Sequence, residues 1–230
     1  MRWRRRKRSR RPSARTSSEA LRSKCRKARR GKQALEQSEG TDMNGYQGAV
    51  MWFTGLSGAG KTTTARYAAG KLRERGRLVE VLDGDELRHT VCKGLGFTRE
   101  DRFENIRRVV YLAKLLSRNG VDVLVSAITP YKDMRDYARG ELPGYAEVYV
   151  ECPLQVCEAR DVKGLYAKAR KGEVTAFTGI SDPYETPEHP ELTLRTQSVS
   201  LEANGAAVVE WLERHSPLPG WAPRNGKALP

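Results

Sequence analysis

The sequence predicts an α/β protein in which a mostly parallel, five-stranded sheet is covered by helices on both faces. Three observations indicate this class. Short apolar segments alternate with longer segments of helical periodicity, a glycine-rich loop separates the first apolar segment from the first helix, and polar or acidic residues follow the next apolar segments. Because such an alternation is typical of a parallel sheet between two helical layers, we expect a three-layer domain.

The individual elements follow from apolar spacing and from glycine or proline at the ends. Short apolar runs predict strands at 49–54, 78–82, 121–125, 146–150 and 192–194. Longer periodic runs predict helices at 61–75, 99–118, 131–139, 153–160, 165–171 and 201–214. The second strand runs into Asp83-Gly84-Asp85, and we expect a polar segment without a helix to follow as far as Thr98.

The glycine-rich loop is the most informative motif. Residues 55–62, with the sequence GLSGAGKT, fit the phosphate-binding P-loop pattern, and a strand before and a helix after give it the required context. We therefore expect a P-loop NTPase fold that binds ATP and Mg²⁺; a chance match in a glycine-bearing turn is the alternative. The residues expected to bind ATP are Gly55, Leu56, Ser57, Gly58, Ala59, Gly60, Lys61, Thr62 and Thr63.

Lys61 and Thr62 have distinct expected roles. Lys61 would reach the β- and γ-phosphates and act in catalysis, and the Thr62 hydroxyl would ligate Mg²⁺. The loops 83–88 and 126–131 follow two further strands, so they should converge with the P-loop at one edge of the sheet. In the first of them, Asp85 is the expected second catalytic group, holding Mg²⁺ through water or accepting a proton; a simple Asp-Gly turn is the alternative.

A group of arginines indicates a second, anionic ligand. Arg88 lies near the second loop, and Arg102 and Asn105, three residues apart, share one face of the helix 99–118. Guanidinium groups match phosphate or sulfate oxygens. The alternative is surface pairing with the acidic residues at 100, 101 and 104.

Two phenylalanines and one long connection complete the expected site. Phe97 and Phe177 lie in polar surroundings, where a ring can stack on a nucleobase or pack beneath a loop. The segment 163–184 is long, basic and punctuated by glycine, which is typical of a lid that excludes water during phosphoryl transfer.

The charge is unevenly distributed. Residues 1–47 hold 16 Lys and Arg against 4 Asp and Glu, a net of +12, whereas residues 48–230 hold 26 against 24. We expect a disordered basic extension at 1–47, a P-loop domain at 48–215 and a loose tail at 216–230. The extension could bind nucleic acid or an acidic partner, or be a solvated or wrongly annotated addition.

Several classes are disfavoured. The four cysteines form no C-x-x-C pair, which argues against a zinc site and a disulfide framework, and no apolar run reaches the length of a membrane span. The N-terminus lacks the apolar stretch of a secretory signal. We therefore expect a cytoplasmic protein without a membrane partner.

Taken together, these motifs resemble the adenylyl-sulfate kinase family over roughly residues 47–196. The specific blocks are DRFENIRR at 101–108, KGLY at 163–166 and FTGI at 177–180, in register with further blocks at 55–62, 82–85, 95–97 and 126–131. Departures include Lys132, where many members have arginine, and Arg195, where an aspartate is common.

The resemblance implies transfer of the ATP γ-phosphoryl group to the 3′-hydroxyl of adenosine 5′-phosphosulfate, giving 3′-phosphoadenosine 5′-phosphosulfate for sulfate assimilation. It implies substrate contacts by Asp85, Arg88, Phe97, Arg102, Asn105, Ile128, Lys163 and Phe177. Some members are described with a phosphorylated serine at the position of Thr129, although direct transfer is the simpler mechanism. It also implies a homodimer, and a separate ATP sulfurylase upstream.

Two alternatives stay open at the level of sequence. One is another small-molecule P-loop kinase, acting on a sugar or nucleoside phosphate. The other is a nucleic-acid-binding protein that acts through residues 1–47.

Overall fold

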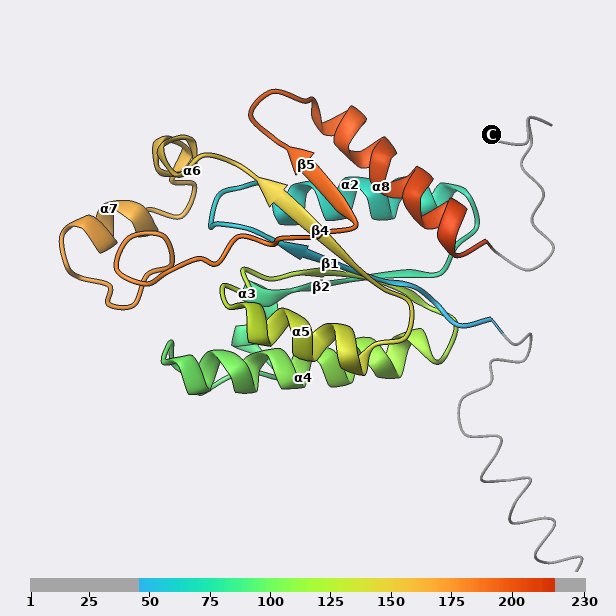
Figure 1. Cartoon of the computed structure of the whole chain (residues 1–230), viewed down its shortest axis with the longest axis horizontal. Helices are drawn as coiled ribbons and strands as arrows, with labels where there is room; N and C mark the ends of the chain where they lie inside the picture. Colours follow the sequence, from blue (N-terminus) through green and yellow to red (C-terminus); the bar gives the residue numbers. More distant parts are fainter. Residues whose placement is uncertain (1–45, 218–230) are drawn as a thin grey trace, which may run out of the picture. The chain divides into compact units, whose positions relative to one another are not determined.

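The computed structural model describes residues 46–217, which form a sheet between two layers of helices (Figure 1). The basic run expected to be disordered and the end of the loose tail, 1–45 and 218–230, lie outside the described residues. The strands are β1 (Val50–Thr54), β2 (Val79–Asp83), β3 (Asp122–Ser126), β4 (Tyr145–Glu151) and β5 (Leu192–Arg195). The helices are α2 (Lys61–Glu74), α3 (Gly84–His89), α4 (Arg99–Ser117), α5 (Lys132–Glu141), α6 (Leu154–Arg160), α7 (Leu165–Arg170) and α8 (Leu201–His215).

The sheet has the order β2-β3-β1-β4-β5, and every pairing is parallel. The predicted five-stranded parallel sheet is therefore confirmed. Strand β1 is central and buried along its whole length, which explains its continuous apolar sequence. All five strands point their carboxyl ends toward the same edge, where loops can converge.

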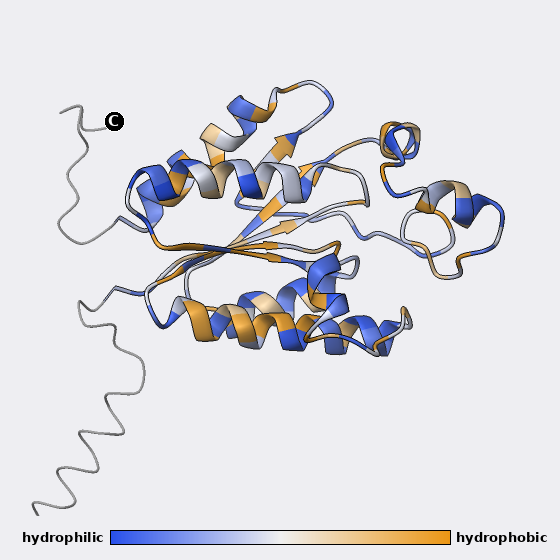
Figure 2. Cartoon of the chain, turned by 180° about the vertical axis from the view of Figure 1, so that it is seen from behind, coloured by the Kyte–Doolittle hydropathy of each residue, from blue (hydrophilic) through white to orange (hydrophobic). Residues whose placement is uncertain are grey.

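The alternation of side chains along β1 divides the core into two halves. Met51 and Phe53 pack toward α2 and α8, whereas Val50 and Trp52 pack toward α4 and α5. Figure 2 shows the strands coloured largely as hydrophobic, between helices in which hydrophilic and hydrophobic residues are mixed, as expected for helices that bury one face. Helices α6 and α7 extend beyond the sheet at its carboxyl edge (Figure 1).

One element was missed by the sequence analysis. The segment expected to be irregular begins with helix α3, whose N-cap is Asp83. The Asp83 carboxylate accepts hydrogen bonds from the N–H groups of Asp85, at 2.9 Å, and Glu86, at 3.4 Å. An aspartate three residues before a glutamate is a start signal for a helix, and here it outweighs the turn tendency of Asp-Gly.

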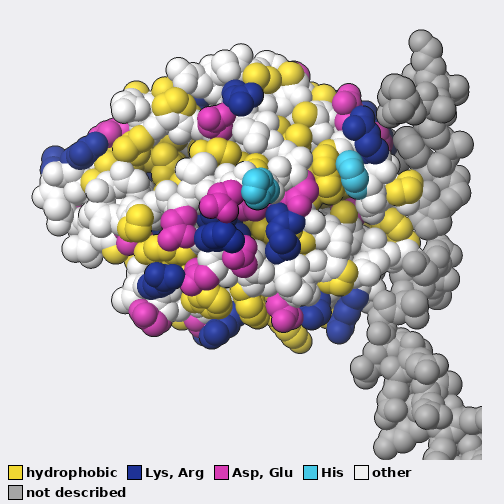
Figure 3. Space-filling model, viewed as in Figure 1, with side chains coloured by type: hydrophobic (Ala, Val, Ile, Leu, Met, Phe, Trp, Pro, Cys, Tyr) yellow, Lys and Arg dark blue, Asp and Glu magenta, His cyan; other side chains and the backbone are white. Residues whose placement is uncertain are grey.

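Charges of both signs are interleaved over the face drawn in Figure 3, in keeping with the near-neutral charge counted after residue 47. None of the helices within 46–217 is both long and apolar enough to cross a membrane.

Candidate functional site

The three loops expected to converge do meet at the carboxyl edge of the sheet. The N–H of Gly55 lies 3.5 Å from the carbonyl oxygen of Ile128, which joins the first loop to the third. The second loop is equally close, because a Cβ atom added at Gly84 would lie 3.1 Å from the Ser126 carbonyl oxygen. The β1, β2 and β3 loops therefore form one continuous surface.

The P-loop has the backbone conformation that its glycines allow. Gly55, Gly58 and Gly60 have φ values of 144°, 72° and 100°, which side chains rarely adopt. A Cβ atom at Gly55 would also lie 2.6 Å from the carbonyl oxygen of Val150. The loop then runs into α2, whose N-terminal N–H groups and dipole favour a bound anion.

Lys61 lies at the start of α2 and is folded back over the loop. Its side chain is buried, and its Nζ donates to the carbonyl oxygens of Gly55, at 3.0 Å, and Leu56, at 2.8 Å. Burial lowers the pKa of Lys61 to about 8, and the nearby Asp85 carboxylate opposes this effect. Neutral carbonyls compensate an ammonium only partly, so Lys61 is suited to gain a phosphate partner.

Three residues that the sequence analysis did not single out brace this loop from outside. Thr196 Oγ1 donates to the Ala59 carbonyl oxygen at 2.7 Å, and Arg160 Nη1 lies 3.3 Å from the Gly58 carbonyl oxygen. The Tyr166 hydroxyl donates to the Ser57 carbonyl oxygen at 2.9 Å. Tyr166 stands in the KGLY block that suggested the family, but spacing alone could not link it to the P-loop.

Oxygen ligands suited to a hard cation gather beside α2. Thr62 Oγ1 and Ser126 Oγ are 2.8 Å apart, and Thr63, the next residue of α2, is exposed. Asp85 is exposed in α3, where Lys163 Nζ contacts its Oδ2. Lys163, in the predicted lid, thus reaches the predicted catalytic carboxylate in this structure.

Arg88 and Phe97 form one wall of the expected second-ligand site. The Arg88 guanidinium lies 4.4 Å from the centroid of the Phe97 ring, and its Nη1 donates to the Gly96 carbonyl oxygen at 3.0 Å. Phe97 is 53% exposed, so its ring is available to a ligand. Burial, and then repulsion by Arg102, lower the pKa of Arg88, which has no carboxylate within ion-pair distance among the described residues.

Arg102 and Asn105 form the floor of the same expected site, and both side chains are buried in α4. Arg102 contacts protein groups: its Nε donates to the Phe97 carbonyl oxygen at 2.9 Å and its Nη2 lies 3.5 Å from Asp182 Oδ2. The Asn105 Oδ1 atom is buried without a hydrogen-bond partner. An unpartnered buried amide oxygen is costly, and a bound ligand could satisfy it.

Phe177 and Ile128 are placed differently from Phe97. Phe177 is only 9% exposed, and its ring meets that of Tyr166 edge-on, with centroids 4.9 Å apart. It therefore packs against helix α7, with little of its ring open to a ligand. Ile128 is half-buried in the loop after β3 and accepts a hydrogen bond from Thr54 Oγ1 at 2.6 Å.

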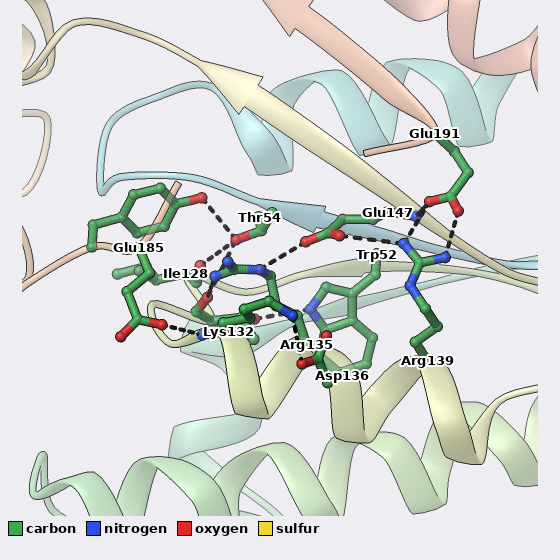
Figure 4. A network of polar contacts seen from close by, with 12 residues as sticks. Trp52, Thr54, Ile128, Lys132, Arg135, Asp136, Arg139, Glu147, Glu185 and Glu191 are labelled. Atoms are coloured by element: carbon green, nitrogen blue, oxygen red, sulfur yellow. Dashed lines mark hydrogen bonds and ion pairs between the residues drawn. The ribbon is translucent and has the colours of Figure 1, made fainter. Parts of the chain in front are cut away.

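Thr129 is turned into the protein. Its side chain is 2% exposed, and its Oγ1 accepts a hydrogen bond from the Trp52 indole nitrogen at 2.8 Å. Thr54 and Arg135 anchor the same loop from the sheet and from α5, within the polar network of Figure 4. The hydroxyl therefore serves the packing of the loop in this structure.

The comparisons with known proteins agree with this geometry. The sequence matches the Adenylylsulphate kinase family over residues 47–195. It is 56% identical over 167 residues to an adenylyl-sulfate kinase of Rippkaea orientalis, covering 73% of this chain and 92% of that protein. It is 54% identical to an adenylyl-sulfate kinase of Halothermothrix orenii, covering 74% and 92%.

A solved structure extends the comparison to three dimensions. The APS kinase CysC of Mycobacterium tuberculosis, determined in complex with AMPPNP and APS, has a TM-score of 0.72 and 46% sequence identity with this chain. The match covers 73% of this chain and 99% of that one. On this sequence and structural agreement, the chain belongs to the adenylylsulphate kinase family.

Proposed function

We propose that this protein transfers the γ-phosphoryl group of ATP to the 3′-hydroxyl of adenosine 5′-phosphosulfate, giving 3′-phosphoadenosine 5′-phosphosulfate. The observation that carries this proposal is the meeting of a P-loop with an arginine-rich, aromatic wall at one edge of the sheet. The relative solved with AMPPNP and APS supports the assignment of one nucleotide to each half.

The donor half binds ATP through residues 55–63. The backbone N–H groups of the loop and of the first turn of α2 hold the phosphates, and Lys61 moves from the Gly55 and Leu56 carbonyl oxygens to the transferring phosphoryl group. Its charge there offsets the charge that develops during transfer. Lys61 is thus a catalytic residue in this proposal.

Mg²⁺ fits the residues beside α2. The donor set consists of the Thr62 hydroxyl, with Ser126 2.8 Å away, and the exposed Asp85 carboxylate, and hard oxygen ligands suit this cation. Within the described part of the chain, no group of three or more His, Cys, Asp or Glu could hold a metal alone. Mg²⁺ is commonly held by one or two protein ligands together with phosphates, where it neutralises their charge.

The acceptor half binds adenosine 5′-phosphosulfate. Arg88 and Arg102 supply an excess of positive charge over the single carboxylate of Asp182, and the unpartnered Asn105 Oδ1 accepts a hydrogen bond from the ligand. Phe97 stacks on the adenine, while Phe177 and Ile128 complete the walls. Positioning of this kind is the main contribution of a protein to phosphoryl transfer.

Asp85 accepts the proton of the attacking 3′-hydroxyl. In the ligand-free chain this carboxylate is paired with Lys163, and both side chains are at least half exposed, so the contact is easily exchanged. When both nucleotides are bound, Lys163 moves to their phosphates and Asp85 faces the hydroxyl. The lid then excludes water from the transferring group.

The transfer is direct, without a phosphothreonine. The burial of Thr129 and its hydrogen bond from Trp52 support this choice, because a nucleophile must reach the γ-phosphate. Homodimer formation, a cytoplasmic location, a separate ATP sulfurylase upstream and nucleic-acid binding by residues 1–47 stay predictions.

An assay of the purified chain tests the function. The chain is incubated with Mg-ATP and adenosine 5′-phosphosulfate, and the 3′-phosphorylated product is separated by chromatography. Adenosine 5′-monophosphate, gluconate and nucleosides serve as matched acceptors. Preferential phosphorylation of the sulfated nucleotide is expected, and a preference for a sugar would replace this proposal with the other class of small-molecule kinase.

A further inference from the structure

The segment 176–182, which carries Phe177, is held in a tight turn. The N–H groups of Ile180, Ser181 and Asp182 all donate to the Phe177 carbonyl oxygen, at 3.0 to 3.1 Å. Ala176 has a φ of 53°, in the left-handed region that a non-glycine residue keeps only when its surroundings hold it there. The position of Phe177 therefore depends on whatever fixes this turn.

Arg102 is the first anchor. Its Nη2 donates to the carbonyl oxygen of the strained Ala176 at 2.5 Å, and its Nη1 donates to Thr178 Oγ1 at 3.2 Å. The Nε group meanwhile holds the Phe97 carbonyl oxygen at 2.9 Å. One buried guanidinium on α4 thus links the backbone beside Phe177 to the backbone of Phe97.

Asp182 is the second anchor, because its carboxylate pairs with the Arg102 guanidinium. Its Oδ2 lies 3.5 Å from Arg102 Nη2, the one carboxylate within ion-pair distance of that guanidinium among the residues described. The Tyr131 hydroxyl donates to both carboxylate oxygens of Asp182, at 2.9 and 3.0 Å. Tyr131 is itself buried at the start of α5, so the carboxylate is fixed from two elements.

The other side of the segment borders an open cavity. The cavity has a volume of about 580 Å³ and is lined by Leu56, Tyr149 and residues 179–184, and Ile180 packs with Leu56 against the apolar core. Beyond Asp182, the Tyr184 hydroxyl lies 3.0 Å from Thr54 Oγ1, the Glu185 N–H donates to the Pro130 carbonyl oxygen at 2.8 Å, and the Glu185 carboxylate accepts from the Lys132 N–H at the start of α5 (Figure 4). These contacts hold the chain after the turn, whereas the backbone at Ala176 is held by Arg102.

We propose that Asp182 is a positioning residue, which acts through Arg102 and Tyr131 to place Phe177 and thereby sets the affinity for the acceptor nucleotide. This inference rests on the proposed function. Asp182 compensates the charge of a buried guanidinium, so that Arg102 keeps its bonds to Ala176 and Thr178. Without this carboxylate the turn loses its anchor, and the Phe177 wall of the site shifts.

The same contacts extend to the lid. Phe177 packs edge-on against Tyr166, whose hydroxyl donates to the Ser57 carbonyl oxygen in the P-loop. Tyr166 belongs to α7, within the predicted lid. Loss of the Asp182 anchor should therefore loosen α7 as well as the acceptor site.

Initial-rate kinetics test the positioning role. In Asp182→Asn we expect the KM for adenosine 5′-phosphosulfate to rise about tenfold or more, while the KM for ATP stays within about twofold, because only the acceptor wall is displaced. Tyr131→Phe should give a smaller rise, and the double variant should be less than additive. Asp182→Glu should recover part of the loss. The matched control is Asp136→Asn, which removes an exposed i,i+4 ion pair with Lys132 and should change neither KM.

A second measurement does not depend on activity. Lys168, Arg170 and Lys171 are exposed trypsin sites in and next to α7, and their cleavage rate reports on the lid. We expect faster cleavage in Asp182→Asn than in the wild type or in Asp136→Asn. If the wild type shows no turnover of the sulfated nucleotide, the proposed function fails and the cleavage comparison alone decides the positioning role.

Three outcomes would overturn the inference. They are an unchanged KM for the acceptor in a folded Asp182→Asn, an equal rise in both KM values, or an unchanged cleavage rate. Circular dichroism establishes that the variants are folded. If Asp182→Asn does not fold, Tyr131→Phe replaces it, because that variant keeps the Asp182–Arg102 pair and removes only the hydroxyl contact.

Discussion

The two halves of the site are built by different means. The donor half is made of main chain: a glycine loop followed without interruption by α2, with Lys61 reaching only carbonyl oxygens of its own loop. The acceptor half is made of side chains from α3, the 95–97 loop, α4 and the 176–182 turn, linked by Arg88, Arg102 and Asp182.

This difference indicates where substitutions should act. A main-chain cradle tolerates side-chain changes except at its glycines, its lysine and the proposed Mg²⁺ donor Thr62, because the phosphate contacts come from N–H groups. A side-chain pocket depends on each member, because the removal of one group leaves another buried without a partner. Variants of the two halves should therefore separate in kinetics, with losses of rate on one side and of acceptor affinity on the other.

The largest effect is expected for Lys61→Ala. We expect kcat to fall by about two to three orders of magnitude, because the charge on the transferring phosphoryl group is no longer offset. Single-turnover measurements with ATP and adenosine 5′-phosphosulfate check this. Lys71→Ala is the matched control, since Lys71 lies on the same helix, where it forms an exposed pair with Glu74 and lies over the Tyr67 ring. Near-normal turnover in Lys61→Ala would contradict the role of this loop.

The next effect belongs to the acceptor half. In Arg88→Ala we expect the KM for adenosine 5′-phosphosulfate to rise about tenfold to a hundredfold with a small change in kcat, because a charged hydrogen-bond donor to the ligand is lost. Steady-state kinetics with varied acceptor check this. Arg107→Ala is the control, because Arg107 is exposed on α4 and lies near Glu104 and the Phe103 ring. An equal change of this KM in the two variants would indicate that Arg88 does not contact the acceptor.

The same contrast explains what the sequence could predict. The sheet, all five strands and the P-loop follow from local patterns. Each apolar run, and the P-loop motif that includes Gly60 and Lys61, can be recognised from a few consecutive residues. Helix α3 was missed because Asp83-Gly84 is also a turn signal. Its start is clear only when Asp83 is considered together with Glu86.

The acceptor half was predictable in composition but not in geometry. Arg88, Phe97, Arg102 and Asn105 do gather at one edge, yet nothing in their spacing indicates that Phe177 packs on Tyr166. Contacts such as Arg102 with Asp182 join residues far apart in the chain, and their closeness depends on the folding of the whole sheet. The family resemblance supplied the residue types, and the tertiary structure supplies the pairings.

A pH dependence should distinguish the donor half from the acceptor half. Because burial lowers the pKa of Lys61 to about 8, this side chain is mainly charged below that pH and mainly neutral above it in the ligand-free chain. Bound phosphates favour the charged form, so nucleotide binding above about pH 8 requires uptake of a proton, and the affinity for ATP falls as the pH rises further. The affinity for the acceptor should not follow this curve.

Calorimetry in two buffers of different ionisation enthalpy measures the proton uptake. We expect close to one proton per nucleotide at about pH 9 and a small fraction at about pH 7. Lys61→Arg is the control, since a guanidinium stays charged throughout this range. Equal uptake at both pH values would show that Lys61 is already charged before the nucleotide binds.

The smallest effect on activity is expected for Thr129→Ala. Thr129 is 2% exposed and its hydroxyl accepts a hydrogen bond from the Trp52 indole N–H, so direct phosphoryl transfer should continue at a rate within a few-fold of the wild type. The free energy of unfolding should fall instead, by about 1–3 kcal/mol, because the buried indole N–H loses its hydrogen-bond partner. Denaturant unfolding measures this loss, and Thr129→Ser, which keeps the hydroxyl, should recover most of it. A fall in kcat as large as that of Lys61→Ala, with stability unchanged, would instead favour a phosphorylated intermediate at Thr129. The Thr129 hydroxyl, in the loop after β3, would then accept the phosphoryl group from ATP and pass it to the acceptor, and the division of the site into a cradle and a pocket would not describe the reaction fully.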